Sequence, residues 1–380
     1  MELFMRLIVL SLFLPILPFT AFTQNLPEQL GPPSPPVDTP SLFLSIDNTN
    51  FFKNNEFDND YVAGYSKPGF FINPSLVWVI SDDTQMGGGI NLLKYFGEGG
   101  FNQVRPIFYL QHRLWNGIDL RMGSIKSTRH HNLIDPLYHY ERFLDENTEN
   151  GLQFLIDKPF VRADVWLNWK NFITHGDDSR EIFETGISSE WPLYAKHQDF
   201  NINFPLQAIF EHKGGQIDHS GKPVSTLANF AAGPSLELDL ASGILTSLEW
   251  ETMYVGYRYL SPGDIRNIQK GHGLMSALSV NMQSFQCRFI WWDAKRFFSF
   301  AGNPMYQTYS IRKELFVGEK RELLVGKLRY TRKYQDLHFI FNLDTYWSPP
   351  DHQMDYGFGI YLLLNTDLFL KKVNKRRNGH

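Results

Sequence analysis

The sequence contains very little cysteine, since Cys287 is the single cysteine among 380 residues. One cysteine excludes an internal disulfide framework and any metal site built from several cysteines. The formal net charge is −4, so no basic nucleic-acid surface is indicated and we expect no nucleic-acid partner. Apolar runs of about 20 residues, which helical membrane spans require, are missing outside the N-terminus. These absences exclude disulfide scaffolds, nucleic-acid-binding proteins and helical membrane bundles.

The N-terminus has the layout of a targeting segment. Arg6 precedes an apolar stretch from Leu7 to Phe19, and small or polar Ala21 and Thr23 follow at a plausible cleavage site. The stretch is short and contains two prolines, which disfavours a membrane anchor. We therefore predict a secretory signal peptide over residues 1–23. Residues 24–40 contain six prolines and predict an extended periplasmic linker.

From about Ser41 onward the hydrophobic period is two. In the stretch 160–170, Val161, Ala163, Val165, Leu167 and Trp169 alternate with mostly charged or polar residues, interrupted by Trp166. Successive side chains of a strand point to opposite sides, so this stretch predicts a strand with one apolar and one polar face. Similar alternation recurs along the chain, and helical periodicity is nearly absent. The pattern predicts an all-β protein, although a soluble β-sandwich alternates in the same way.

The connections between these strands alternate between short and long. Tight turns are predicted at 81–83, 115–117, 157–159, 192–198, 241–243, 284–286 and 333–336, where turn-forming residues cluster. Longer polar loops are predicted at 48–68, 96–102, 126–150, 171–181, 212–226, 259–272, 294–320 and 348–354. Seven turns and eight loops give sixteen strands, within a range of 14 to 18. This number requires Met305 to Ile311 to belong to a loop, since a separate strand there would make seventeen. Both termini then lie at the rim with the short turns.

An even number of amphipathic strands with short turns at one rim, a signal peptide and the glycine-rich closing strand Gly357 to Leu362 resembles porin-like outer-membrane β-barrel proteins. The resemblance covers residues 41–370. It implies an antiparallel up-and-down transmembrane barrel in the outer membrane, inserted by the barrel-assembly machinery and surrounded by lipid bilayer and lipopolysaccharide. It also implies passive passage of small solutes. One departure is that Phe369 is followed by Leu370 and a basic tail, residues 371–380, which we expect on the periplasmic side.

Aromatic residues lie in or at the ends of the predicted strands, as in the interfacial girdles of such barrels. Core packing is the alternative for these rings. The residues concerned are Trp78, Tyr95, Trp115, Trp169, Trp191, Trp250, Tyr257, Tyr259, Trp291, Trp292, Tyr346 and Trp347.

Charged residues on the polar faces are predicted to point into the lumen, and both signs are present. They would solvate the interior and set a transverse field that sorts solutes by charge. We predict as pore-lining Asp119, Arg121, Arg162, Asp164, Lys170, Glu249, Glu251, Lys327 and Arg329. The two longest loops, 126–150 and 294–320, are expected to fold inward and constrict the channel.

The loop 126–150 also contains His130, His131 and several carboxylates, which invites a metal-binding interpretation. On an extended chain, however, neighbouring histidines point apart, so a polar loop lining or capping the pore is the preferred interpretation. The segments 212–219 and 175–178 are interpreted as ordinary loops. We predict no catalytic residue, no cofactor and no metal.

Other functions fit the same pattern. An embedded hydrolase would need a nucleophile–histidine arrangement, and no motif such as Gly-x-Ser-x-Gly singles out a nucleophile. A receptor or structural role needs only the barrel. A secreted all-β glycan-binding protein fits the alternation of short and long connections less well. The solute and the oligomeric state stay open at this stage.

Overall fold

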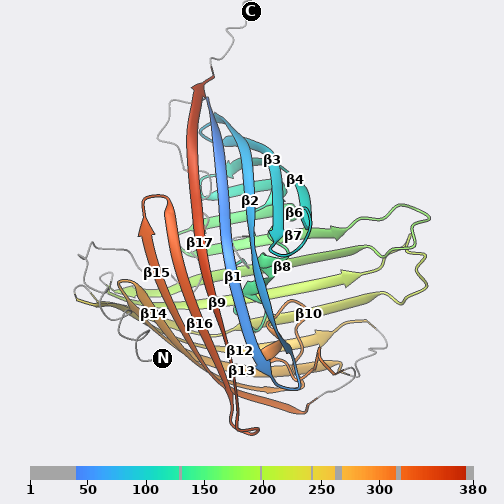
Figure 1. Cartoon of the computed structure of the whole chain (residues 1–380), viewed down its shortest axis with the longest axis vertical. Helices are drawn as coiled ribbons and strands as arrows, with labels where there is room; N and C mark the ends of the chain where they lie inside the picture. The colour runs from blue at the N-terminus through green and yellow to red at the C-terminus, as the bar shows by residue number, and fades with distance from the viewer. Residues whose placement is uncertain are drawn as a thin grey trace, which may run out of the picture.

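The computed structural model describes residues 40–127, 131–196, 199–240, 243–261, 268–313 and 318–373. About two thirds of these residues form one antiparallel sheet (Figure 1). Its strands are β1 Ser41–Asp58, β2 Ala63–Ser81, β3 Thr84–Tyr95, β4 Gln103–Trp115, β5 Ile118–Ile125, β6 Glu149–Lys158, β7 Val161–Asn171, β8 Ile182–Lys196, β9 Phe200–Lys213, β10 Ser225–Ala232, β11 Ser235–Asp239, β12 Leu245–Tyr259, β13 Lys270–Met282, β14 Phe285–Lys295, β15 Lys320–Tyr334, β16 Leu337–Ser348 and β17 Gln353–Lys372. The described helices are two short 3₁₀ turns, η1 Tyr140–Leu144 and η2 Pro304–Tyr306. In the described ranges, no helix combines the length and apolarity that a membrane span needs.

The sheet closes on itself because β1 pairs with both β2 and β17. Strands β10 and β11 each pair with β9 on one side and β12 on the other. They are therefore two halves of one wall strand, interrupted at Gly233 and at Pro234, which has no N–H to donate to a ladder. The wall is a closed barrel of sixteen strands, as the sequence predicts.

Short and long connections alternate along most of the chain, but the loop-rim connections 59–62 and 349–352 are as short as the turns at the other rim. Tight turns join the strands at one rim, where β1 begins and β17 ends, and the two longest connections, 126–148 and 296–319, leave the other rim. We call the first the turn rim and the second the loop rim. The segment 305–311 lies inside the second of these loops, as predicted. The predicted loop 48–68 is wrong, because β1 runs to Asp58 and β2 starts at Ala63. Its polar run of asparagines forms strand rather than loop.

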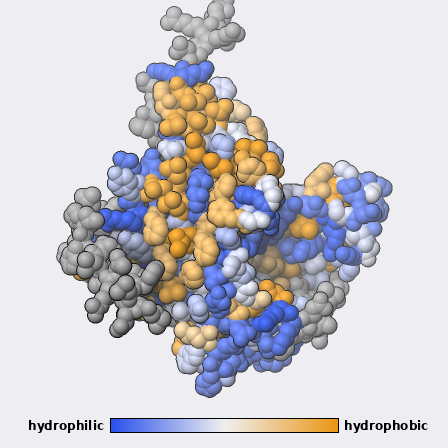
Figure 2. All heavy atoms as spheres, in the orientation of Figure 1, coloured by the Kyte–Doolittle hydropathy of each residue, from blue (hydrophilic) through white to orange (hydrophobic). Residues whose placement is uncertain are grey.

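Side chains alternate between the outside and the lumen along each wall strand. In β7, Asp164, Trp166 and Asn168 are buried inside, whereas Val165 and Leu167 between them are only partly covered. Hydrophobic side chains gather on the outer surface over β17, β1 and β2 (Figure 2). An apolar exterior over a polar interior is the inverse of a soluble domain and is typical of a transmembrane barrel.

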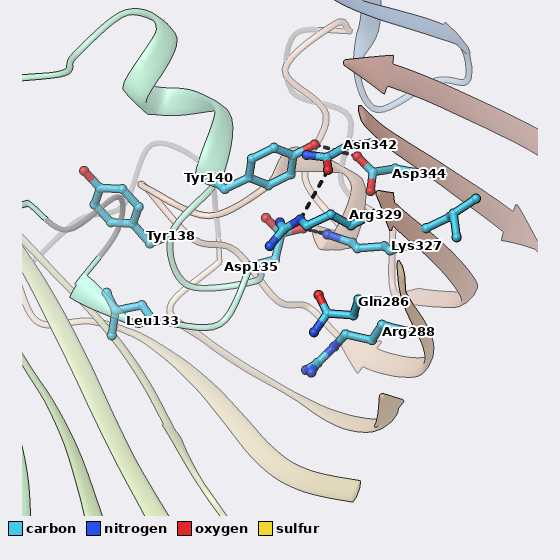
Figure 3. Close-up of a pocket in the computed structure, with 11 residues that line it drawn as sticks. Leu133, Asp135, Tyr138, Tyr140, Gln286, Arg288, Lys327, Arg329, Asn342 and Asp344 are labelled. Atoms are coloured by element: carbon cyan, nitrogen blue, oxygen red, sulfur yellow. Dashed lines mark hydrogen bonds and ion pairs between the residues drawn. The ribbon is translucent and has the colours of Figure 1, made fainter. Parts of the chain in front are cut away.

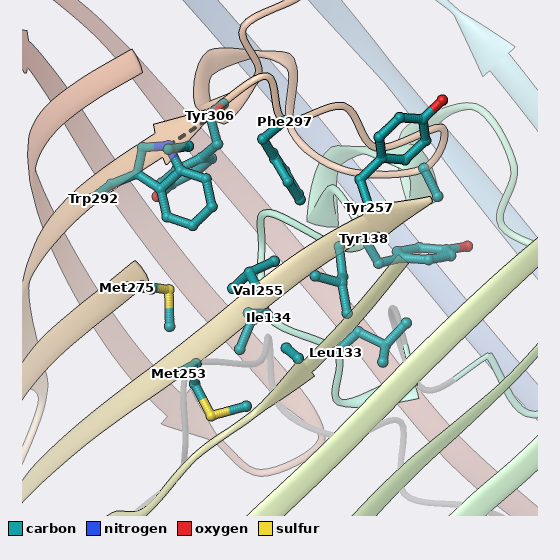
Figure 4. Close-up of a cluster of buried hydrophobic side chains, with 14 of the residues drawn as sticks. Leu133, Ile134, Tyr138, Met253, Val255, Tyr257, Met275, Trp292, Phe297 and Tyr306 are labelled. Carbon is teal, nitrogen blue, oxygen red and sulfur yellow. Dashed lines mark hydrogen bonds between the residues drawn. The ribbon is translucent and has the colours of Figure 1, made fainter. Parts of the chain in front are cut away.

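The lumen is filled from the loop rim by the loops 126–148 and 296–319. Leu133, Ile134 and Tyr138 of the first loop pack in one buried cluster with Phe297 and Tyr306 of the second (Figure 4). Inward residues of the wall complete this cluster, namely Met253, Val255, Tyr257, Met275 and Trp292. The indole nitrogen of Trp292 donates to the carbonyl of Tyr306 at 2.9 Å. The loop that we expected to be polar is therefore partly an apolar plug.

The predicted aromatic girdle stays possible only for the rings that face outward. Trp78, Trp115, Trp169, Trp191, Trp250, Trp291 and Trp347 are each exposed by 38% or more. Tyr257, Trp292 and Tyr346, by contrast, are almost completely buried and belong to the interior cluster. These three rings face inward because they occupy the inward positions of the two-residue period.

The predicted signal peptide, almost all of the proline-rich linker and most of the basic tail lie outside the described residues. The described wall begins at Ser41 and ends at Lys372.

Candidate pore constriction

The loop 126–148 enters the lumen at a local reversal of the backbone. His131 and Asn132 both have positive φ values, 52° and 56°, so the chain is not extended here. This corrects the expectation of an extended chain at the histidine pair; His130 lies outside the described residues. The amide of Gln153 in β6 donates to the carbonyl of Lys126 and its oxygen accepts from the Lys126 N–H. The wall thereby fixes the start of the loop.

The His131 side chain is completely buried between two wall carboxylates. Its Nδ1 lies 2.7 Å from Asp164 and its Nε2 lies 2.7 Å from Glu149, and the imidazole stacks on Trp166 at 3.8 Å between ring centroids. Burial alone would lower the pKa of His131, but the carboxylates of Asp164 and Glu149 outweigh burial and raise this pKa to about 10. His131 is therefore a buried cation at neutral pH. Both ring nitrogens are occupied by carboxylates, which leaves neither for a metal.

A second buried ion pair holds the middle of the loop. Lys53 of β1 reaches Glu141 at 3.2 Å and Asp344 of β16 at 3.3 Å, and all three side chains are almost completely buried. The hydroxyl of Tyr140 donates to Asp344 at 2.5 Å. Burial would raise the pKa of Glu141, but the Lys53 ammonium holds this pKa well below its ordinary value. The loop is thus attached to opposite parts of the wall by charge.

A small polar cavity remains between the loop and the wall strands β14, β15 and β16. Its volume is about 50 Å³, which leaves room for a few water molecules. Cationic and anionic groups face it, from the wall and from the loop (Figure 3). The lining side chains include Arg288, Lys327, Arg329, Asp135, Asp344, Tyr140 and Asn342.

The loop itself supplies one of the two acids at this cavity. Asp135 lies 2.8 Å from the Lys327 ammonium and accepts a hydrogen bond from Asn303 of the second loop. Burial would raise the pKa of Asp135, but Lys327 and His139 lower it below its ordinary value. Arg329 of β15 donates to Asn342 at 3.2 Å, directly opposite on the neighbouring strand β16. A negative charge from the loop therefore lies beside positive charges from the wall at this cavity.

The predicted pore-lining residues fall into three groups. Lys327 and Arg329 line the cavity, and Glu251 lies next to it through an ion pair with Arg288. Asp164 and Lys170 contact the inserted loop, through His131 and Glu146 respectively. The remaining residues are not brought to the cavity: Asp119 accepts from Gln111, Arg121 stacks on Tyr109, the exposed Arg162 pairs with Glu190, and Glu249 does not line it.

Sequence reasoning missed Asp135, Arg288 and Lys53 as site residues. Arg288 carried a usable signal, because it occupies the inward register of β14 together with Ile290 and Trp292. Lys53 lies in the segment predicted as a loop, so its inward position could not be inferred. Asp135 lies in an irregular loop, where the period of two gives no direction.

The described residues offer little for metal or nucleophilic chemistry. Across the described ranges, no group of three or more His, Cys, Asp or Glu side chains is arranged to hold a metal ion. One hydroxyl–imidazole pair faces outward at the loop rim, where His212 Nδ1 lies 2.9 Å from the Thr226 hydroxyl. In the described part of the chain, no carboxylate contacts the His212 ring, so the third member of a catalytic triad is missing there.

The fold places the chain in the class of porin-like outer-membrane β-barrels, with a lumen filled by its own loops. A family model described as lipid A 3'-O-deacylase-type matches residues 34–373, and the chain belongs to this family. None of the curated proteins matches the sequence significantly.

Several solved structures are similar in overall fold. The outer membrane protein OprD from Pseudomonas aeruginosa has a TM-score of 0.49 and 9% identity, covering 87% of this chain and 94% of its own. OprB from Pseudomonas putida has a TM-score of 0.49 and 7% identity, covering 86% and 94%. A BenF-like porin from Pseudomonas fluorescens Pf-5 has a TM-score of 0.49 and 9% identity, covering 86% and 99%. At this level of similarity, the matches carry no functional argument.

Proposed function

We propose that the protein is a restricted channel for small polar solutes, in which the loop 126–148 controls passage. The observation that carries this proposal is the cavity with opposed charges: Asp135 of the loop faces Lys327 and Arg329 of the wall. Charged side chains of both signs at a constriction act on the charge and orientation of a passing solute. They also make this cavity polar, in contrast to the apolar plug beside it.

Buried charges and hydrogen bonds hold the loop in the lumen together with its apolar cluster. Such contacts give it a defined position, and they can exchange for water when the loop moves. The cavity of about 50 Å³ has room for only a few water molecules, so we expect larger solutes to need displacement of the loop. The proposed channel therefore conducts weakly at rest and more strongly when the loop leaves its position.

Ion selectivity in planar lipid bilayers tests this proposal. Arg329→Gln removes a positive charge at the cavity while its partner Asn342 is neutral, so we expect the reversal potential in a KCl gradient to shift towards cations. Arg162→Gln is the matched control, because Arg162 is exposed and lies away from the cavity. Equal reversal potentials for both variants, or no conductance in any folded protein, would refute the channel proposal.

The family match favours a second candidate function, hydrolysis of an acyl ester of lipid A in the outer leaflet. The outward pair of His212 and Thr226 at the loop rim is the place where such a reaction is chemically conceivable. His212 would accept the hydroxyl proton as the Thr226 oxygen attacks the ester carbonyl, and would return it to the departing alcohol. Water would then hydrolyse the acyl-threonine.

Mass spectrometry of lipid A incubated with the purified barrel tests this second candidate. The expected product is lipid A that has lost one acyl chain, and Thr226→Val should abolish its formation. His112→Gln is the control, because His112 forms a similar pair with Thr84 at the turn rim. Unchanged lipid A after incubation with the folded wild-type protein would exclude the hydrolase.

A further inference from the structure

Two histidines from separate loops lie against each other at the loop rim. His175 belongs to the connection 172–181 between β7 and β8, and His219 belongs to the connection 214–224 between β9 and β10. Their ring centroids are 4.9 Å apart, and the ring planes make an angle of 65°. Taken separately, the two connections are ordinary loops. The fold brings together two imidazoles that lie far apart in the sequence.

The side chain of Arg180 ties the two connections to each other. Its Nε donates to the carboxylate of Asp218 at 3.3 Å, and its Nη2 donates to the carbonyls of Lys213 at 2.7 Å and Pro223 at 2.6 Å. Arg180 lies in the first connection, whereas all three acceptors lie in or beside the second. Because Asp218 directly precedes His219, these contacts place the second histidine beside the first loop without involving either ring.

The backbone next to each histidine is also held by a carboxylate. Asp177 accepts hydrogen bonds from the N–H of Thr174 at 2.7 Å and from its hydroxyl at 3.2 Å, and Thr174 is the residue before His175. On the second loop, Asp218 accepts from the N–H of Ser220 at 2.8 Å. Side chains that project from fixed turns lose less conformational freedom when they bind a ligand.

Both rings are open to a ligand from solvent. The two histidines are exposed, and among the described residues neither ring forms a hydrogen bond or an ion pair. His131 is the opposite case, because carboxylates occupy both of its ring nitrogens. The ring nitrogens of His175 and His219 can therefore coordinate a metal ion without displacing a protein partner.

The spacing of the two rings fits coordination of one ion. With metal–nitrogen bonds of about 2.0–2.1 Å, the centre of a ligating imidazole lies about 3.2 Å from the metal. Two such rings at coordination angles of roughly 90–109° have centroids about 4.5–5.2 Å apart. The observed separation of 4.9 Å lies within this range.

We propose that His175 and His219 form a binding site for a divalent transition metal ion such as Cu²⁺ or Zn²⁺. Imidazole nitrogen suits these ions, whereas Mg²⁺ and Ca²⁺ prefer oxygen ligands. Each histidine supplies one nitrogen and water supplies the other ligands, since the described residues contain no group of three or more metal-binding side chains. The bound ion joins the two loops from outside the lumen, so the site depends on neither the channel nor the hydrolase.

Copper binding to the folded barrel in detergent tests the proposal. The protein must be untagged, because a histidine tag binds the same ions. With less than one Cu²⁺ per barrel, pulsed electron paramagnetic resonance counts the coordinated imidazoles, and we expect two in the wild type. We expect one or none in His175→Gln and in His219→Gln. Calorimetric titration with Zn²⁺ should show that each substitution weakens binding by about tenfold or more, because the second imidazole binds at high effective concentration.

His272→Gln is the matched control, because it removes another exposed histidine near the loop rim and should bind like the wild type. Arg180→Gln keeps both ligands but removes the contacts between the loops, so it should bind Zn²⁺ more weakly than the wild type. Heat-modifiable gel migration verifies that each variant is folded. A single coordinated imidazole in the wild type, wild-type affinity in either histidine variant, or an equal loss in His272→Gln would overturn the proposal. Displacement of Zn²⁺ by an equal concentration of Mg²⁺ would also overturn it.

Discussion

At the scale of single residues, the buried charge of His131 makes stability depend on pH. Its folded pKa of about 10 lies above the ordinary value of about 6.5, so folding favours the protonated form. The resulting stabilisation is fully present below about pH 6.5 and is lost progressively as the pH rises through about 10. The temperature at which half of the protein is unfolded in detergent should therefore decrease as the pH is raised from about 6.5 to about 10. Heat-modifiable gel migration measures this temperature.

The variant His131→Phe separates this effect from the titration of other groups. It leaves Asp164 and Glu149 buried without their cation, so at pH 6.5 it should be less stable by about 3–5 kcal/mol. Its additional loss between pH 6.5 and 10 should be much smaller than that of the wild type. His272→Gln, at an exposed position, should behave like the wild type. If the thermal midpoints of His131→Phe and wild type decreased in parallel with rising pH, His131 would not be a buried cation.

The sequence predicts which way a side chain faces, but it does not predict which residue that side chain contacts inside the barrel. Trp166 looked like an interruption of the polar face of β7, yet it is the ring on which His131 stacks. The pattern of alternation gives the face of a side chain but not its partner. The partner here comes from a loop 33 residues away from Asp164, and no local rule connects the two.

At the scale of strands, the alternation of faces gives a direct prediction. Val165 lies between the buried Asp164 and Trp166 and therefore points outward to lipid. Val165→Arg should cost about 2–4 kcal/mol near the membrane midplane. Arg162→Ala should leave assembly nearly intact, because Arg162 is exposed near a turn. Folding yield into lipid vesicles measures both, and similar yields for the two variants would show that the face assignment is wrong.

The contact between the two inserted loops gives another prediction. A Cβ atom added at Gly302 would lie 2.0 Å from the carbonyl oxygen of Pro136, so the backbones of the two loops touch there. Gly302→Ala should separate the loops and speed hydrogen exchange at Leu137 and Tyr306, while the wall exchanges as before. Gly99→Ala is the control, since nothing lies within 4 Å of its added Cβ. Unchanged exchange in Gly302→Ala would mean that the loops do not support each other.

Much of the element pattern could be predicted from sequence. The turns and the sixteen wall strands follow from alternation and from turn-forming residues, whereas the inward course of the two loops was expected only from their length and from the resemblance to porin-like barrels. The predicted loop 48–68 was wrong because asparagines such as Asn54 and Asn55 are typical of turns, whereas here they continue β1. The plug was only partly predicted, since Leu133 and Leu137 are apolar residues without a period and their packing partners lie on distant strands.

At the scale of the whole molecule, the barrel combines a lipid-compatible exterior with a packed interior. Sixteen strands enclose enough space for a water-filled channel unless loops occupy it. The loops 126–148 and 296–319 occupy it here, and buried ion pairs attach the first of them to the wall. The filled lumen and its charged cavity therefore depend on both the wall and the loops.

The central claim is that the loop 126–148 controls passage through the lumen, and single-channel recording in planar bilayers tests it most directly. The measurement compares the wild type with a variant in which a short Gly-Ser linker replaces residues 133–146, both verified as folded by heat-modifiable migration. We predict small or infrequent current steps for the wild type and clearly larger steps for the variant. Equal steps in both proteins, or no current through the folded variant, would contradict the claim.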